Sequence, residues 1–560
     1  MNKCLLWFLV GSALVCGQDI GARYLIITHD NFYGAVQPLA QWKHRKGIRT
    51  KIVKLSEIGS TPEEIKGYIQ NAYMHWQIRP EYLLLVGAPN FLPIYYCDSV
   101  YTPYYSDNFY TDMDSDVENE ILSGRLTVHD VPEAENVINK ILLYEKIPNT
   151  SDSSWFKSAC LIVRECYDYQ DDSIYWSDIN HAKNLMRDRG YDVIDTLSRS
   201  AGHNASDVIS SVDAGRGIVL YRGSGSNNWG TPFDIDPNQA NNGMKLPIVL
   251  SITCRGIGTG VTPAIVEQWL LTGTPYQPKG AAGYFASLTI IEYGAHLRSA
   301  ICKGFFEALF LQDIKTFGEA CEAGRLNVLN MYGSTTEYRS FTTLGDPEMN
   351  IWTATPKPLD VSHVSQISLS DESLLVSVEC QNSPVESALV CVLLDGIVYE
   401  YGYTNTGGDI ILQFDTLTPG TMHVTVTAQN KIPYLDSIQI VYVNIGETII
   451  QKLIGLSEIT ISPNPFSNIL QIKYSIEEIY TVDDILFKET SAYMKPEVKI
   501  YDAIGRLVKS FELSTVRPLG ENSILWNGRD EANRPLSSGV YFISVVSACA
   551  NQSTAVIMLK

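Results

Sequence analysis

The cysteine in the most informative position for chemistry is Cys254. It directly follows an apolar stretch, residues 246–253, whose composition predicts a buried β-strand, and Gly256 comes two residues later. Ligands of open α/β sheets bind where the parallel strands end, so a strand here would expose the thiol at the sheet edge. A thiol in that setting can act as a nucleophile. The alternative interpretation is a buried apolar cysteine, which is a common place for a free thiol.

A second candidate is an acidic repeat. Asp112, Asp114 and Asp116 alternate with other residues, and carboxylates at this spacing offer the hard oxygen ligands that Ca²⁺ prefers. The glycine that a calcium loop needs for its sharp turn is absent, because Val117 follows Asp116. Two interpretations stay open: a structural Ca²⁺ site and a solvated acidic turn.

The elements that would position these residues alternate along the chain. Apolar, β-branched stretches predict strands at residues 24–28, 50–55, 82–87, 159–163, 217–221, 247–253 and 280–286. Residues 61–64 have the composition of a helix start, and residues 176–189 form a further helical stretch. This alternation predicts a parallel sheet covered by helices on both faces, with functional residues after the strand ends.

Composition limits the possible functions. The 560 residues are 45% apolar and 19% charged, which predicts a globular protein of several domains. The chain has 42 lysines and arginines against 62 aspartates and glutamates, and its net charge of −20 repels nucleic-acid phosphates. We therefore expect no nucleic-acid partner. The absence of Cys-x-x-Cys and His-Glu-x-x-His motifs argues against zinc.

The first 17 residues have the pattern of a secretory signal peptide. Lys3 provides a positive start, residues 4–16 are apolar but too short to span a bilayer, and Val15 and Gly17 are small enough for a cleavage site. We expect a mature chain that begins at Gln18, is exported and has no transmembrane segment.

Beyond residue 358 the hydrophobic period changes to two. Residues 359–447 predict a small β-sandwich, and residues 457–560 predict a second all-β module that opens with Ser462-Pro463-Asn464-Pro465-Phe466.

Several short motifs occur in an order that a known family shares. They are Trp42-Lys43, Lys46-Gly47, Gly124-Arg125, Tyr144-Glu145, Tyr221-Arg222-Gly223-Ser224-Gly225-Ser226 and Gly345-Asp346-Pro347. On these motifs, residues 22–353 resemble the gingipain family of cysteine peptidases, peptidase family C25. The resemblance implies an α/β, caspase-like fold of two parallel-sheet subdomains, residues 22–150 and 155–353, followed by two all-β modules. It also implies peptide or protein substrates.

The resemblance carries a catalytic Cys–His dyad onto Cys254 and Ser224. The family has its histidine between two glycines, where this chain has Ser224, 30 residues before the cysteine. An imidazole makes the thiolate available and protonates the leaving amine, and a serine hydroxyl does neither near neutral pH. A replacement base would have to be His203 or His296.

Two carboxylates complete the implied site. Glu165 corresponds to an acidic residue that supports the family's dyad, with a plain surface carboxylate as the alternative. Asp178 lies in a segment that resembles the one that binds an arginine side chain of the substrate, with a helix-surface aspartate as the alternative. The family's use of calcium favours Ca²⁺ at Asp112, Asp114 and Asp116; no other cofactor is expected.

The resemblance continues beyond the α/β part. Residues 388–434 resemble the Ig-like domain that follows the gingipain catalytic domain, and residues 457–560 resemble a type IX secretion sorting module. They imply export by the type IX machinery to the cell surface or medium. The leading hypothesis is a secreted gingipain-like cysteine peptidase whose activity is weakened or lost at Ser224. The alternatives are a pseudo-peptidase that binds peptides or surfaces, and an adhesin that works through its Ig-like domain.

Overall fold

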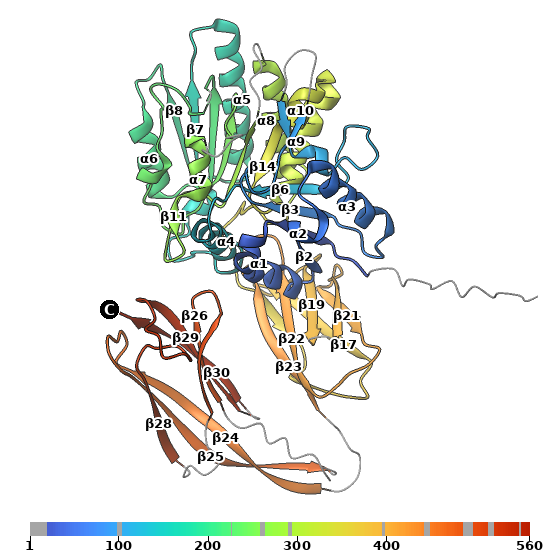
Figure 1. Ribbon diagram of the computed structural model, residues 1–560, viewed down its shortest axis with the longest axis vertical. Helices are drawn as coiled ribbons and strands as arrows, with labels where there is room; N and C mark the ends of the chain where they lie inside the picture. Colours follow the sequence, from blue (N-terminus) through green and yellow to red (C-terminus); the bar gives the residue numbers. More distant parts are fainter. Residues whose placement is uncertain are drawn as a thin grey trace, which may run out of the picture. The chain divides into compact units, whose positions relative to one another are not determined.

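A computed structural model describes residues 20–97, 104–225, 227–257, 264–288, 294–394, 398–441, 448–484, 497–512, 520–547 and 550–560 (Figure 1). The predicted signal peptide, residues 1–17, and Ser226 lie outside this part. The chain forms two compact units. The first comprises the residues up to Pro358 together with Thr427–Pro433, and the second comprises Leu359–Val426 and Tyr434–Lys560.

The first unit is built on one ten-stranded sheet (Figure 1). In spatial order its strands are β2 (Thr50–Lys54), β1 (Tyr24–Thr28), β3 (Tyr82–Val86), β6 (Leu122–Leu126), β14 (Phe341–Leu344), β13 (Gly283–Ser287), β10 (Ile248–Ile252), β9 (Ile218–Gly223), β7 (Ser158–Arg164) and β8 (Val193–Ser198). The pairs are parallel except β13–β14, which is antiparallel. The two predicted subdomains are therefore halves of one sheet, and β14 joins them.

Burial explains why these short stretches are strands. Every residue of β1, β3, β10 and β13 is buried, which confirms the prediction of a sheet covered on both faces. Strands β6, β8 and β14 were not predicted from their apolar pattern. Residues 122–126 contain Gly124 and Arg125, and half of β8 is only partly buried, so neither stretch has the continuous apolar character of a central strand.

Ten helices in the described residues accompany the sheet. They are α1 (Tyr33–Arg45), α2 (Leu55–Ile58), α3 (Pro62–His75), α4 (Val131–Lys146), α5 (Tyr169–Asp188), α6 (Ala205–Ala214), α7 (Gln268–Leu271), α8 (Ala295–Phe310), α9 (Phe317–Tyr332) and α10 (Thr335–Ser340). The predicted start at Thr61 is confirmed: its hydroxyl caps α3, and Glu64 returns the bond in a capping box. The predicted helix at 176–189 begins earlier, at Tyr169, because Asp168 caps it. Helix α8 packs against both α5 and α9.

The sequence motifs around Lys43 form a buried ion cluster. The Nζ atom of Lys43 lies 2.6 Å from carboxylate oxygens of Glu145 and Glu348 and contacts Asp346 at 2.5 Å. Lys46 adds a second cation to Glu145 and Glu348. Burial would raise the pKa of Glu145, but the two lysines outweigh it and lower that pKa to about 2. These motifs therefore tie α1, α4 and the segment after β14 together.

Two short hairpins complete the first unit: β4 (Tyr95–Cys97) with β5 (Tyr104–Ser106), and β11 (Gly273–Thr274) with β12 (Gln277–Pro278). None of the helices in the described ranges has the length and apolar content needed to cross a bilayer. No disulfide joins the eight cysteines of the described residues, and five of these are buried.

The second unit contains two all-β modules, in agreement with the predicted fold class. The first has one sheet of β15 (Asp360–Ser362), β17 (Ser373–Cys380), β18 (Ser383–Pro384) and β21 (Asp409–Gln413), and another of β16 (Gln366–Ser368), β23 (Tyr434–Val441), β22 (Gly420–Thr427), β19 (Leu389–Leu394) and β20 (Val398–Tyr403). Strand β17 alternates exposed and buried residues, as the period of two predicts.

The last module also has two sheets. They are β24 (Thr448–Ser462), β25 (Leu470–Asp484) and β28 (Gly520–Trp526), and β27 (Leu507–Glu512), β26 (Glu497–Asp502), β29 (Gly539–Ser547) and β30 (Ala550–Met558). Its core is one buried cluster that contains Phe466, Trp526, Ile543 and Met558. The conspicuous Ser462–Phe466 motif therefore contributes its phenylalanine to the core of this module.

Candidate active site

The ends of β9 and β10 bring the two predicted dyad positions to one edge of the sheet. The strands pair in parallel up to Arg222 and Ile252, so the loops that carry Ser224 and Cys254 leave the sheet side by side. The Thr253 hydroxyl donates to the Gly225 carbonyl at 3.3 Å. Asn227 N donates to the Arg255 carbonyl at 2.9 Å. The two strand ends are therefore neighbours.

Cys254 is half-buried and lies beside a buried ion pair. Its Sγ accepts a hydrogen bond of 3.0 Å from Nη1 of Arg298, in the first turn of α8. Nη2 of the same guanidinium lies 2.9 Å from Oε1 of Glu337 on α10. Both side chains are withdrawn from solvent, and burial raises the pKa of Glu337 although Arg298 opposes this. A cation beside the sulfur stabilises negative charge on it.

Ser224, unlike Cys254, is hydrogen-bonded within its own loop and to the end of β7. Nη1 of Arg164, the last residue of β7, donates to Oγ of Ser224 at 2.6 Å and to its carbonyl at 3.2 Å. The Tyr221 hydroxyl donates to the same carbonyl at 2.8 Å. Arg164 also donates to the Thr231 carbonyl at 3.0 Å, which closes the loop from the other side. The serine hydroxyl is thus part of the loop's internal bonding.

The loop around Ser224 needs its glycines because backbone packs against it. A Cβ on Gly223, whose φ is +159°, would lie 2.7 Å from the Arg164 carbonyl. A Cβ on Gly225 would lie 2.6 Å from the Asn228 carbonyl. The glycines therefore permit a close approach of chains, and the space beside Ser224 is filled by Arg164.

Glu165 is buried and organises the end of β8. Its Oε1 accepts from the Ser200 hydroxyl at 2.6 Å and from the Trp176 indole at 3.2 Å. Its Oε2 accepts from the backbone N–H groups of Arg199 at 3.0 Å and Ser200 at 3.3 Å. These contacts describe a carboxylate that fixes a turn, and a role in orienting a base at residue 224 stays a prediction.

Asp178 is fully enclosed and already holds a guanidinium. Nε of Arg222 donates to its Oδ2 at 2.7 Å, and the Ser299 hydroxyl donates to its Oδ1 at 2.5 Å. Arg222 also donates to the carbonyls of Ile252 at 2.9 Å and Ala295 at 3.0 Å. This internal aspartate–guanidinium pair ties α5, β9, the end of β10 and α8 together, and a role of Asp178 in binding a substrate arginine stays a prediction. A substrate arginine would have to displace Arg222.

The two histidines considered as replacement bases lie on other elements than Ser224 and Cys254, although His296 is close enough to Glu337 to act on its pKa, which it lowers against the effect of burial. Nδ1 of His203 accepts from the Ser198 N–H at 3.2 Å and helps to close the turn after β8. His296 is exposed, and its ring lies edge-on against Tyr332 of α9 with centroids 5.1 Å apart. Neither follows β9 or β10, where the dyad positions lie.

The acidic repeat forms a compact turn in the first half of the sheet. One oxygen each from Asp112, Asp114 and Asp116 lie within 4.8 Å of one another, a separation that oxygen ligands about 2.4 Å from a Ca²⁺ ion can span. The donors fit a hard cation, but Oδ2 of Asp112 also accepts from Arg339 of α10 at 3.0 Å. Val117 takes the position of the missing glycine with φ of +94°.

Sequence reasoning did not find Arg164, Arg298 or Glu337. Arg222 left a signal, since a charge inside a buried strand requires a partner. Arg298 and Glu337 left none, because a single charge on a helix has the same pattern whether it is buried or solvated. Their partnership with Cys254 exists only in three dimensions.

Comparisons with known proteins agree with this geometry. The model of peptidase family C25 matches residues 18–352, and the model of the FlgD Ig-like domain matches residues 484–551. The first match spans more than half of the chain, so the chain belongs to peptidase family C25. The second match lies in the module predicted to be a sorting domain.

Individual relatives are distant. Gingipain R1 of Porphyromonas gingivalis is 23% identical over 426 residues, which are 73% of this chain and 42% of gingipain R1. Lys-gingipain of the same organism is 22% identical over 454 residues, 74% of this chain and 25% of its own length. The chain thus spans less than half of either relative.

Solved structures establish the fold. The crystal structure of the Arg-specific cysteine proteinase gingipain R matches with a TM-score of 0.67 at 20% identity, over 76% of this chain and 99% of that one. The complex of pro- and mature domains of RgpB from Porphyromonas gingivalis matches with a TM-score of 0.68. The predicted caspase-like α/β fold followed by all-β modules is confirmed.

Proposed function

We propose that this chain is an exported cysteine peptidase relative that binds peptide or protein substrates at the β9–β10 edge and attacks them with Cys254. The observation that carries the proposal is the half-buried Cys254 thiol at the end of a central strand, 3.0 Å from a buried guanidinium. A thiolate at such an edge is a nucleophile that a bound peptide can reach.

Cleavage of ordinary amide bonds is expected to be slow. A leaving amine must be protonated, and general acid–base catalysis contributes about 10²–10⁴-fold. The Ser224 hydroxyl is held by Arg164, and a hydroxyl does not exchange protons near neutral pH as an imidazole does. The rival proposal, a pseudo-peptidase that binds without cleaving, rests on the same residue.

The test is hydrolysis of fluorogenic peptides with Arg, Glu or Leu before the scissile bond, by the parent and by Cys254→Ala. We expect slow release that disappears in the variant. Binding of the same peptides to Cys254→Ala, without release by the parent, would favour the pseudo-peptidase. Fast parent cleavage abolished by His203→Ala or His296→Ala would show that another base serves Cys254.

We further propose export through residues 1–17 and the type IX machinery through residues 457–560, and a structural Ca²⁺ at Asp112, Asp114 and Asp116. The export proposal rests on the signal pattern and on the resemblance of the last module. Mass analysis of secreted protein is expected to find a start near Gln18 and loss of the chain from about Leu456; a mature protein with both ends intact would contradict it.

A further inference from the structure

We infer that Arg298 is a catalytic residue of the Cys254 site, positioned by Glu337, and that this centre accepts acyl groups from donors whose leaving group needs no proton, such as thioesters. The inference deepens the proposed function and rests on it for the substrate class. It starts from three atoms in series: Sγ of Cys254, the guanidinium 3.0 Å away, and a carboxylate oxygen 2.9 Å beyond.

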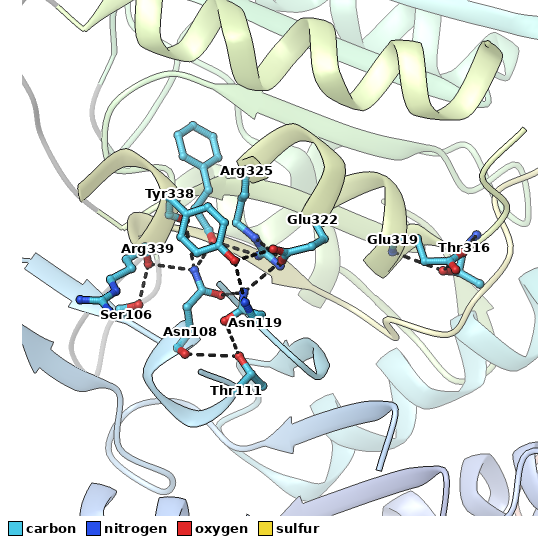
Figure 2. Close-up of polar contacts among 11 residues, drawn as sticks. Ser106, Asn108, Thr111, Asn119, Thr316, Glu319, Glu322, Arg325, Tyr338 and Arg339 are labelled. Carbon is cyan, nitrogen blue, oxygen red and sulfur yellow. Dashed lines mark hydrogen bonds and ion pairs between the residues drawn. The ribbon is translucent and has the colours of Figure 1, made fainter. Parts of the chain in front are cut away.

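The Glu337 carboxylate is held in place because the two residues that follow it in α10, Tyr338 and Arg339, are anchored to neighbouring elements (Figure 2). The next residue, Tyr338, donates its hydroxyl to Glu322 at 2.5 Å and accepts from the Asn119 N–H at 2.9 Å. Arg339 pairs with Asp112, and Asn108 donates to the Tyr338 carbonyl at 3.1 Å. Glu337 is thus held on a rigid turn, which suits a positioning residue.

The guanidinium is fixed because the start of α8 is anchored as well. Arg222 donates to the carbonyl of Ala295, the first residue of the helix, and Ser299 donates to Asp178. Arg298 lies between these two contacts. A cation that is already in place costs no reorganisation when negative charge develops on the sulfur.

The charge on Arg298 is secure. Burial would lower the pKa of this guanidinium, but its ion pair with Glu337 and its contact with Cys254 outweigh burial and raise that pKa. The residue therefore stays protonated throughout the physiological range. It stabilises a thiolate, and it does not give up its proton to a leaving amine.

Because Arg298 can stabilise a thiolate but cannot protonate a leaving group, the site favours acyl donors whose leaving group departs as an anion. When the Cys254 thiolate attacks a thioester carbonyl, a bond forms from the carbonyl carbon to Sγ, and the bond from that carbon to the leaving sulfur breaks. The electron pair leaves on a thiolate, which takes its proton from water because thiols ionise near pH 8.5. Water then hydrolyses the acyl-cysteine to a carboxylic acid and restores the thiol. An amide would require protonation of the departing nitrogen, for which Arg298 is too weak an acid.

The first experiment measures the charge beside the sulfur in the intact chain. Iodoacetate and iodoacetamide are nearly equal in size, but only iodoacetate is an anion, so the ratio of their rates at Cys254 reports the local positive charge. Peptide-resolved mass spectrometry separates Cys254 from Cys97 and Cys166, which are also partly exposed. In the folded parent we expect a ratio at least fivefold above that of Cys254 in the urea-unfolded chain.

Variants assign that charge to Arg298. Arg298→Met is expected to return the ratio to the unfolded value, and Arg298→Lys to keep most of it. Arg216→Met is the matched control, because Arg216 pairs with Asp195 on β8, away from Cys254, and the ratio should not change. Glu337→Gln is expected to lower both rates, since Arg298 loses its anchor. Cys166 provides an internal control: burial and Asp172 raise its pKa, so it should react more slowly folded than unfolded.

Two outcomes would overturn the inference. The first is a parent ratio no higher in the folded than in the unfolded chain, a result that needs no variant to fold. The second is an unchanged ratio in folded Arg298→Met.

The second experiment tests the acyl donor. A short peptide ending in alanine is offered as its benzyl thioester and as its benzylamide, which differ only in sulfur against nitrogen. We expect the parent to accelerate thioester cleavage over background at least 100-fold more than amide cleavage, with both lost in Cys254→Ala. Equal acceleration of the two would overturn the leaving-group inference. Equal acceleration would keep the proposed function, whereas anion-selective labelling without turnover of either peptide would contradict both the proposed function and the catalytic role of Arg298, so the two failures are distinguishable.

Discussion

The ends of β9 and β10 lie side by side, yet the chain uses them in opposite ways. At the end of β9 the Ser224 hydroxyl and carbonyl are taken up by Arg164 and Tyr221, and the loop is bonded to itself. At the end of β10 the residue Cys254 is half-exposed, and the guanidinium of Arg298, from α8, donates to its sulfur. Both ends have an arginine partner, but Arg164 bonds to neutral oxygens and Arg298 bonds to sulfur and a carboxylate.

The difference shows that Arg164 has a structural role, whereas Arg298 affects the reactivity of Cys254. A guanidinium that donates to carbonyls and a hydroxyl stabilises a loop conformation. A guanidinium beside a thiol changes the reactivity of that thiol, and Glu337 offsets the cost of its burial. At this edge of the sheet, the surroundings after β10 therefore suit a nucleophile, and those after β9 form a closed turn.

The largest expected effect comes from restoring a general acid–base at residue 224, after β9. Ser224→His alone would place an imidazole beside the Arg164 guanidinium, whose charge opposes the imidazolium form, so we expect less than about a tenfold gain in amide hydrolysis. Ser224→His with Arg164→Gln removes that charge and is expected to gain about 10²–10⁴-fold, the usual worth of a general acid–base. The measurement is kcat/KM on a fluorogenic peptide. Arg164→Gln alone is the control, and a single variant as active as the double would contradict the role of Arg164.

The next effect concerns the buried ion pair between Asp178 and Arg222, which connects the ends of β9 and β10. Asp178→Asn leaves Arg222 buried without its carboxylate, and we expect a loss of about 3 kcal/mol in the free energy of unfolding, measured in urea. Lys303→Met is the control, since this half-exposed lysine lies 3.7 Å from the same carboxylate and should contribute less than about 0.5 kcal/mol. Parental stability together with lost affinity for arginine peptides would instead support Asp178 as a substrate-binding residue.

Lys140 differs from the buried arginines Arg298 and Arg222 because its described contacts include no carboxylate. Nζ of Lys140 donates to the carbonyls of Leu270, Thr272 and Lys279, and burial lowers its pKa to about 7. The unfolded chain keeps this proton up to about pH 10.5, so the folded state binds fewer protons between pH 7 and 10.5.

Stability is therefore expected to rise with pH in that window, by at most about 1.4 kcal/mol per pH unit, and to lose this contribution as pH falls towards 7. Lys140→Met should remove that part of the slope in urea unfolding measured at pH 7, 8 and 9. Identical slopes in parent and variant would show that the three carbonyls keep the ammonium charged throughout.

The smallest expected effect is that of Ca²⁺ on the acidic turn of Asp112, Asp114 and Asp116. Asp112 of this turn pairs with Arg339 of α10, the helix that also carries Glu337. If Ca²⁺ binds at this turn, free Ca²⁺ at ten times its Kd should stabilise the first unit by about 1.4 kcal/mol, or about 2 °C in Tm. The measurement is Tm in Ca²⁺ against EDTA, with Mg²⁺ as a control. Asp114→Asn/Asp116→Asn should abolish the shift, and a shift that survives this variant would place the ion elsewhere.

Much of the fold could be predicted because central parallel strands are continuous apolar stretches. Residues 24–28 and 82–87 predicted β1 and β3 to within a residue for that reason. Strand β8 escaped because it is partly exposed at the edge of the sheet, and β14 because its antiparallel pairing to β13 comes from a segment distant in the chain. The union of two predicted subdomains in one sheet depends on that single strand.

The sequence by itself determined the class of the protein, the nucleophile position Cys254 and the serine at residue 224, because these are identities at fixed points in an ordered set of motifs. Only the tertiary structure decided what surrounds them. Arg298, Glu337, Arg164 and Asp178 come from four elements separated by up to 173 positions, from 164 to 337, and each has its partner by packing. A charged residue in a sequence does not reveal whether burial will join it to a thiol, a carbonyl or another charge, since that choice is made by the elements that fold against it.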